Sequence, residues 1–205
     1  MNTLVIDCAT EACSVALFDG AKLVGGDCRV LGRGHAEHLV PMIAAMPGKG
    51  RADRIAVALG PGSFTGVRVG LAAARALAFA WNSSLLGYPT LALVAAMART
   101  LHPGQPVTSA MTGGHGEWFV QDFAADGSAA SDLASLSPAA AAARGAADLV
   151  AGSQAEALVT VRGHGLAAVL LPDARSFAAL PSWFLTDQVA PLYGRAPDAR
   201  LPGAA

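Results

Sequence analysis

The residues that could bind an anion gather in a glycine-rich segment ahead of a long apolar run. Gly60-Pro-Gly-Ser-Phe-Thr-Gly66 offers three glycines and two hydroxyls directly after a strand-like stretch. Exposed backbone N–H groups at a helix start attract anions, so Gly62, Ser63 and Thr65 are candidates for phosphate binding. The segment has no Gly-Lys-Ser/Thr and is therefore not a Walker loop. The alternative is a tight strand-to-helix connection in which Ser63 or Thr65 caps the helix.

An acid and a hydroxyl near the N-terminus extend this candidate site. Asp7 ends the first apolar run and precedes a polar turn that contains Thr10. At this position an open mixed sheet would present a carboxylate to a cleft. Spacing alone favours the alternative that Asp7 accepts backbone hydrogen bonds within the turn.

A second glycine turn lies in the other half of the chain. Thr112, Gly113 and Gly114 follow a strand-like run and precede His115. Such a turn could cradle a phosphate, although a hairpin loop is the commoner use of paired glycines. Both halves therefore contribute candidate residues for nucleotide binding.

Histidine and cysteine spacing predicts no metal site. His35-Ala-Glu-His38 places its histidines at i and i+3, whereas a zinc-binding helix of the His-Glu-x-x-His type uses i and i+4. Cys8, Cys13 and Cys28 show neither Cys-x-x-Cys spacing nor a second cluster. We expect the thiols to behave as small apolar strand residues in a reducing compartment. No residue is assigned a catalytic role.

Composition narrows the classes of function. The 205 residues are 53% hydrophobic and 14% charged, which predicts a globular chain rather than a disordered one. The net charge of −1 gives no basic excess for autonomous binding to nucleic acid, so we expect a protein or small-molecule partner. The N-terminus lacks the pattern of a signal peptide, and no apolar run approaches the ~20 residues of a membrane span. These features predict a cytoplasmic protein with no membrane partner.

Periodicity predicts an α/β chain with an internal duplication. Three strands joined by hairpins should be followed by a helix, a fourth strand and a long helix, and Gly25-Gly26 should mark a bulge. A weaker copy follows, so we expect an N-terminal lobe over residues 1–100 and a smaller lobe over 101–205 whose tail returns to the first. The predicted strands are 3–7, 13–18, 23–30, 55–59, 107–111, 117–123 and 158–161, and the predicted helices are 35–46, 67–81, 91–101 and 138–144.

Two of these helices are candidates for a subunit interface. The 67–81 helix is apolar nearly all round, so it must be covered on more than one side, by another subunit or by the second lobe. Its alanines would let a partner helix approach closely. The larger apolar side chains of the 35–46 helix would add to the contact, as in a four-helix bundle. The candidate interface residues are His38, Leu39, Met42, Met46, Val69, Ala72, Ala73, Ala76 and Ala80.

Several segments resemble one bacterial family. They are Ile6-Asp-Cys-Ala-Thr-Glu-Ala-Cys-Ser-Val-Ala-Leu17, His38-Leu-Val-Pro-Met-Ile43, Ala58-Leu-Gly-Pro-Gly-Ser-Phe-Thr-Gly-Val-Arg-Val-Gly70 and Pro191-Leu-Tyr-Gly-Arg195. In this order they are similar to the TsaB family, formerly YeaZ, of tRNA threonylcarbamoyladenosine synthesis. The resemblance implies an actin/Hsp70-like (ASKHA) fold of two ribonuclease H-like lobes with mixed sheets, the second reduced.

The resemblance also implies a role without catalysis. A family member pairs with the catalytic paralogue, TsaD, which transfers threonylcarbamoyl to N6 of adenosine 37 in tRNAs reading ANN codons, and the ATPase TsaE is a third member. The paralogue's metal-binding His-x-x-x-His corresponds here to Tyr88-Pro-Thr-Leu-Ala-Leu-Val-Ala95, which has no histidine. Contact with tRNA would be indirect, and the chain alone should form a homodimer.

Two enzymatic alternatives stay open at this point. One is an ATP-binding actin-fold enzyme, such as a small-molecule kinase or ATPase, and the other is a glycoprotease-like hydrolase of the M22 type. The chain lacks both the metal-binding histidines of the paralogue and the lysine of a Walker loop, which favours the non-catalytic role, called the scaffold role below. We expect no resident cofactor, with weak or interface-shared binding of ATP or ADP left open.

Overall fold

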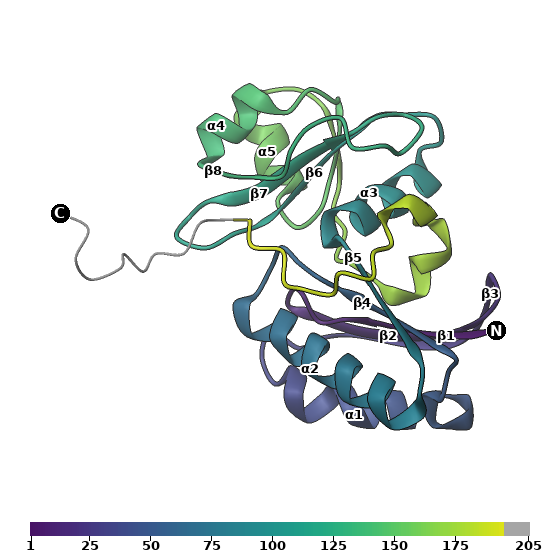
Figure 1. The fold of residues 1–205 in the computed structure, drawn as a ribbon. Coiled ribbons are helices and arrows are strands. Elements are labelled where there is room, and N and C mark those ends of the chain that lie inside the picture. The colour runs from purple at the N-terminus through teal and green to yellow at the C-terminus, as the bar shows by residue number, and fades with distance from the viewer. Residues whose placement is uncertain (195–205) are drawn as a thin grey trace.

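Two mixed β-sheets, with helices between them and on their outer sides, make up the structure (Figure 1). The structure is a computed structural model and describes residues 1–194. Arg195, the last residue of the Pro191–Arg195 segment, lies outside the described residues, as does the end of the predicted 101–205 lobe.

The first sheet has the strand order β3-β2-β1-β4-β5. β1, β2 and β3 are joined by antiparallel hairpins, and β4 and β5 run parallel to β1. A bulge is present directly before the predicted position Gly25-Gly26, because Val24 has no partner where Leu17 pairs with Gly25 and Phe18 pairs with Leu23. The strands are β1 (Asn2–Asp7), β2 (Ala12–Asp19), β3 (Lys22–Val30), β4 (Arg54–Ala58) and β5 (Ser84–Tyr88).

The second sheet repeats this topology. Its strand order is β10-β9-β6-β7-β8, and β6 takes the place that β1 has in the first sheet. On one side of β6, β7 and β8 follow as antiparallel pairs; on the other side, β9 and β10 run parallel to it. The predicted duplication is therefore confirmed in the topology. The second sheet is reduced, because three of its strands have three residues each. Its strands are β6 (Val107–Thr112), β7 (Trp118–Phe123), β8 (Ala134–Leu136), β9 (Leu149–Ala151) and β10 (Leu166–Ala168).

The helices form three layers around the sheets. α1 and α2 cover the side of the first sheet that faces away from the second lobe, α3 lies between the sheets, and α4 and α5 lie on the far side of the second sheet (Figure 1). The first sheet is therefore covered on both faces, which explains why β1 and β4 are almost continuously apolar. The helices are α1 (His35–Ala44), α2 (Phe64–Trp81), α3 (Thr90–Leu101), α4 (Pro138–Arg144) and α5 (Ala155–Arg162).

Two secondary-structure predictions are wrong, and one parallel strand of the first sheet was not predicted. The strand predicted over 158–161 lies within α5, because Ala155 and Leu158 supply a helical apolar face in a segment too short to show its period. The helix predicted from Val67 begins three residues earlier, at Phe64. The parallel strand β5 was not predicted, since Ser84–Tyr88 combines polar and small residues with two leucines.

The segment after the second sheet returns to the first. It contains two 3-10 helices, η2 (Ala174–Ala179) and η3 (Ser182–Phe184). The N–H of Ala174 donates to the Ser14 hydroxyl over 2.9 Å, and Phe177 packs on the rings of Phe18 and Tyr88. A third 3-10 helix, η1 (Pro47–Gly50), follows α1. Within the described residues, every helix is too short or too polar to cross a bilayer.

Candidate functional site

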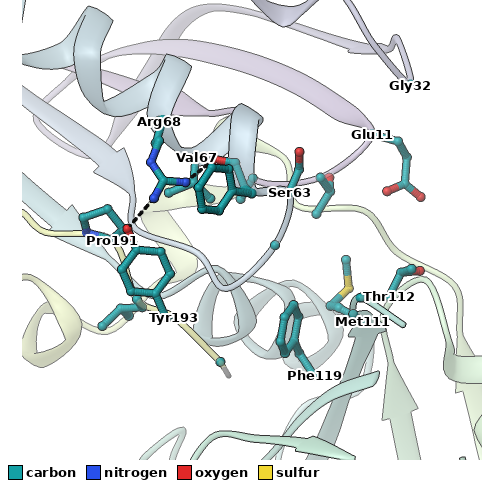
Figure 2. Close-up of a pocket in the computed structure, with 18 residues that line it drawn as sticks. Glu11, Gly32, Ser63, Val67, Arg68, Met111, Thr112, Phe119, Pro191 and Tyr193 are labelled. Carbon is teal, nitrogen blue, oxygen red and sulfur yellow. Dashed lines mark hydrogen bonds between the residues drawn. The ribbon is translucent and has the colours of Figure 1, made fainter. Parts of the chain in front are cut away.

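A cavity of about 670 Å³ opens between the two lobes and brings together residues from both halves of the chain (Figure 2). From the first lobe come Thr10, Gly62 and Ser63. From the β6–β7 turn come Thr112, Gly113 and Gly114. The two hairpin turns that are equivalent in the duplicated topology thus face one cavity. Their capacity to bind a phosphate or nucleotide remains a prediction.

The glycine segment is shaped by a close approach to the first hairpin. A side chain on Gly62 would overlap the carbonyl oxygen of Ala9, and one on Gly66 would overlap that of Cys8. The N–H of Ser63 donates to the Ala9 carbonyl over 2.6 Å, so this donor is not free for a ligand. Ser63 is the N-cap of α2, and its hydroxyl accepts from the N–H of Gly66 at 3.2 Å. The prediction that Ser63 caps the helix is therefore confirmed.

Asp7 does not belong to the cavity, which corrects its assignment as a ligand residue. Its side chain is fully buried, and its carboxylate accepts from the N–H of Ala9 at 3.0 Å and from the Tyr88 hydroxyl at 3.2 Å. Burial raises the pKa of Asp7 from 3.8 to about 7, because removal from water disfavours the charged form. The turn-binding alternative is therefore the one that the structure supports.

Thr65 also lies outside the cavity. It is the second residue of α2, is exposed, and is absent from the residues that line the space. The structure therefore does not bring Thr65 to the cavity, and a role of Thr65 in phosphate binding stays a prediction.

Hydrogen bonds join the polar side chains at the second-lobe wall. The Ser153 hydroxyl accepts from the N–H of Thr112 at 3.0 Å and lies 3.1 Å from the Thr112 hydroxyl. The Gln154 amide donates to that same hydroxyl over 2.8 Å. These bonds fix the Thr112 side chain at the cavity wall.

Sequence reasoning missed the aromatic wall of the cavity. Arg68 donates to the Phe64 carbonyl at 3.1 Å and to the Tyr193 hydroxyl at 2.7 Å, and its guanidinium lies 3.2 Å from the centre of the Phe64 ring. Phe64 and Tyr193 remain 68% and 57% exposed. Phe119 of β7 completes this wall. The N–H of Leu192 donates to the Leu59 carbonyl, and this long-range contact brings Tyr193 here, which no local pattern signals.

The outer face of α1 and α2 divides the predicted interface set. Leu39 and Met42 are buried in this chain's own core, and Met46 is 9% exposed, so their assignment to an interface is wrong. The apolar stripe of α1 packs on its own sheet, as amphipathic helices usually do. The remaining six residues keep surface for a partner: His38, Ala72, Ala76 and Ala80 are exposed, and Val69 and Ala73 are half-buried.

Two large apolar residues on this outer face were not predicted. Phe79 of α2 is 92% exposed, and Val40 of α1 is 57% exposed. α1 and α2 lie side by side on the outside of the first lobe (Figure 1). We define the outer helix face as the exposed apolar residues Val40, Ala72, Ala76, Phe79 and Ala80. The exposed Arg75 borders this face on α2 and donates to the Val189 carbonyl.

One histidine and two cysteines, His35, Cys8 and Cys13, lie in the core. The buried His35 ring nitrogen lies 2.8 Å from the Thr10 carbonyl and ties α1 to the first hairpin. Cys8 and Cys13 are buried, with their sulfurs 3.5 Å apart, and this contact together with burial raises the pKa of Cys8. Among residues 1–194, no three histidine, cysteine or acidic side chains group as metal ligands would.

Comparison with known proteins places this arrangement in context. A family model described as "TsaD: tRNA N6-adenosine threonylcarbamoyltransferase" matches residues 29–141, more than half of the chain. The tRNA threonylcarbamoyladenosine biosynthesis protein TsaB of Escherichia coli (strain K12) is 35% identical over 131 residues, which cover 62% of this chain and 56% of that protein. TsaB of Haemophilus influenzae is 38% identical over 117 residues, or 54% and 49%. The chain thus spans about half the length of these curated relatives.

Solved structures extend the likeness to nearly the whole chain. YeaZ from Pseudomonas aeruginosa superposes with a TM-score of 0.78 at 28% identity, covering 94% of this chain and 99% of that one. The ethanolamine utilization protein EutJ from Carboxydothermus hydrogenoformans has a TM-score of 0.50 at 12% identity, covers 88% and 90%, and shows the fold alone. Together with the two equivalent sheets, these likenesses confirm the predicted actin/Hsp70-like fold.

Proposed function

Because the chain belongs to the TsaD family, as a member of its TsaB/YeaZ group, we propose that it acts in threonylcarbamoyladenosine modification of tRNA. The proposed role is that of a non-catalytic subunit. It pairs with a TsaD-type catalytic subunit, which transfers threonylcarbamoyl to N6 of adenosine 37 in tRNAs reading ANN codons. A TsaE-type ATPase joins the complex, and tRNA is contacted through the complex rather than by this chain alone.

The observation that carries this proposal is the outer helix face. An exposed phenylalanine beside three alanines on α2, with the exposed Val40 on the adjacent α1, is the composition of a helix-packing interface. Monomeric proteins seldom leave contiguous apolar surface of this kind to water. Ala72, Ala76 and Ala80 would allow the partner's helices to approach closely, and Phe79 supplies an aromatic anchor.

The burial of Asp7 supports a role other than nucleotide hydrolysis. A carboxylate that holds a magnesium ion must reach the ligand, and this one is enclosed by the core and by the Tyr88 hydroxyl. We propose accordingly that the chain holds no resident cofactor, and that any ATP or ADP binds weakly or at the interface with the partner.

Reconstitution tests the proposal directly. Purified TsaD-type and TsaE-type proteins, threonylcarbamoyl-adenylate and a tRNA that reads ANN codons are combined with and without this chain. Modified adenosine should form only when all protein components are present, and the chain alone should show no turnover of ATP and no peptidase activity. Full activity without the chain, or ATP turnover by the chain alone, would contradict the scaffold role.

A further inference from the structure

The cavity between the lobes has two chemically different ends. Figure 2 shows Tyr193 and Arg68 on one side of the space, and Glu11 and Thr112 on the opposite side. The first end is aromatic, because Phe64 joins Tyr193 there and both rings are more than half exposed. The second end is polar, with a carboxylate and a fixed hydroxyl.

The aromatic end is organised to receive a planar ring. The guanidinium of Arg68 covers the Phe64 ring and is held by hydrogen bonds to the Phe64 carbonyl and the Tyr193 hydroxyl. These bonds fix the relative positions of the two rings without filling the space between the lobes. Stacking on aromatic and guanidinium planes favours heteroaromatic rings of many kinds, since each presents a π face.

The charges at the cavity argue against a polyphosphate. Among its described lining residues, Arg68 and Glu11 are the charged ones, so their formal charges cancel. Several phosphate charges would meet no basic cluster, and the Glu11 carboxylate would repel them at the polar end. The carboxylate of Asp7 is also withdrawn from the space, so it is not placed to hold magnesium there.

We propose that this cavity binds a nucleoside, with the base against Phe64 and Tyr193 and the sugar hydroxyls at Glu11 and Thr112. A carboxylate accepts hydrogen bonds from sugar hydroxyls, and about 670 Å³ lies within the range of small-molecule pockets. The ligand has no phosphate, which distinguishes this site from a magnesium-nucleotide site. The proposal does not depend on the scaffold role, because the cavity is lined by the first residues of α2, up to Arg68, whereas the outer helix face uses Ala72 to Ala80, further along the helix.

Binding to the full chain alone tests the site, with saturation-transfer NMR and calorimetry as readouts. The probes are adenosine, adenine and ATP with magnesium. Adenosine should bind with a dissociation constant on the order of 0.1–1 mM. ATP with magnesium should bind no more tightly than adenosine. Adenosine that shows no saturation transfer at millimolar concentration, or ATP that binds at least about tenfold more tightly, overturns the proposal.

Two phenylalanines on one helix provide a matched pair of variants. Phe64→Ala removes the ring at the cavity and should weaken adenosine binding about tenfold. Phe79→Ala removes an even more exposed ring of α2 outside the cavity and should leave the affinity unchanged. Equal effects of the two substitutions contradict the proposed base position.

The polar end has its own test. Glu11→Ala should remove the advantage of adenosine over adenine, because only the nucleoside offers hydroxyls to the carboxylate. An undiminished preference for adenosine in this variant would show that Glu11 does not contact the sugar and would overturn the proposed orientation.

Discussion

The hydroxyl of Tyr88, at the end of β5, donates a 3.2 Å hydrogen bond to the carboxylate of Asp7, at the end of β1. The carbonyl oxygen of Ile6 lies 3.3 Å from the same hydroxyl and is a second acceptor for its one hydrogen. Both side chains are fully buried, and β4 separates their strands in the sheet. The Asp7 carboxyl, which could bind a ligand if it faced an open cleft, therefore lies in the core of the first lobe.

This burial predicts a specific dependence of stability on pH. Because the pKa of Asp7 rises from 3.8 to about 7 on folding, its contribution to stability is fully present below pH 4 and is lost as the pH rises through 7. Asp7→Asn removes the titration and should stabilise the chain at pH 8 by up to about 4 kcal/mol, at about 1.4 kcal/mol per unit of pKa. At pH 4 the two proteins should differ little. Urea unfolding at pH 4, 6 and 8 measures the difference, and parallel pH profiles would disprove a buried titration at Asp7.

A second prediction separates the outer helix face from the core. Ala76 is exposed on α2 and Ala74, two residues away, is fully buried. Ala76→Glu should change the free energy of unfolding by no more than about 0.5 kcal/mol while abolishing binding to the TsaD-type subunit. Thermal melts and titration of the partner provide the measurement.

Ala74→Glu is the control for that substitution. It would place a charge against the first sheet and should cost several kcal/mol or prevent folding. Full partner binding by Ala76→Glu with a normal melt would mean that the partner uses another surface.

The isolated chain should self-associate through the same face. A two-fold contact uses one patch twice, so α1 and α2 of two copies can cover each other when the partner is absent. Sedimentation at micromolar concentration should show a dimer, and Phe79→Ser should shift it toward monomer. A wild-type chain that stays monomeric at roughly millimolar concentration would remove the argument from exposed apolar surface.

A fourth prediction concerns the contact between the glycine segment and the first hairpin. Gly62→Ala introduces a methyl group that overlaps the Ala9 carbonyl, a backbone atom that cannot turn aside. It should destabilise the chain by about 1–3 kcal/mol. Gly114→Ala, across the cavity, has open space around the new carbon and should be nearly neutral. Chemical denaturation of both variants decides whether the close approach is required.

Local patterns in the sequence determined most of the elements and the identity of the loop. Alternation and turn chemistry predicted the hairpins of the first lobe, and the glycines of 60–66 predicted a tight strand-to-helix connection capped by Ser63. These features depend on neighbours within a few residues, so composition and spacing are enough to specify them. The short strand Ser84–Tyr88 was not predicted, because it is a strand through its pairing with β4 and not through its composition.

Tertiary structure alone decided which side of each element faces the core, and therefore what the site consists of. Leu39 and Met42 could serve a partner or the chain's own sheet by periodicity alone, and only packing showed that the sheet takes them. Asp7 could face a cleft or the core, and Tyr88, 81 residues later, enclosed it. Tyr193 reaches Arg68 from 125 residues away, so the aromatic wall exists only once the chain returns to the first lobe. Long-range contacts of this kind leave no periodic trace in a single sequence, because each partner sits in its own local context.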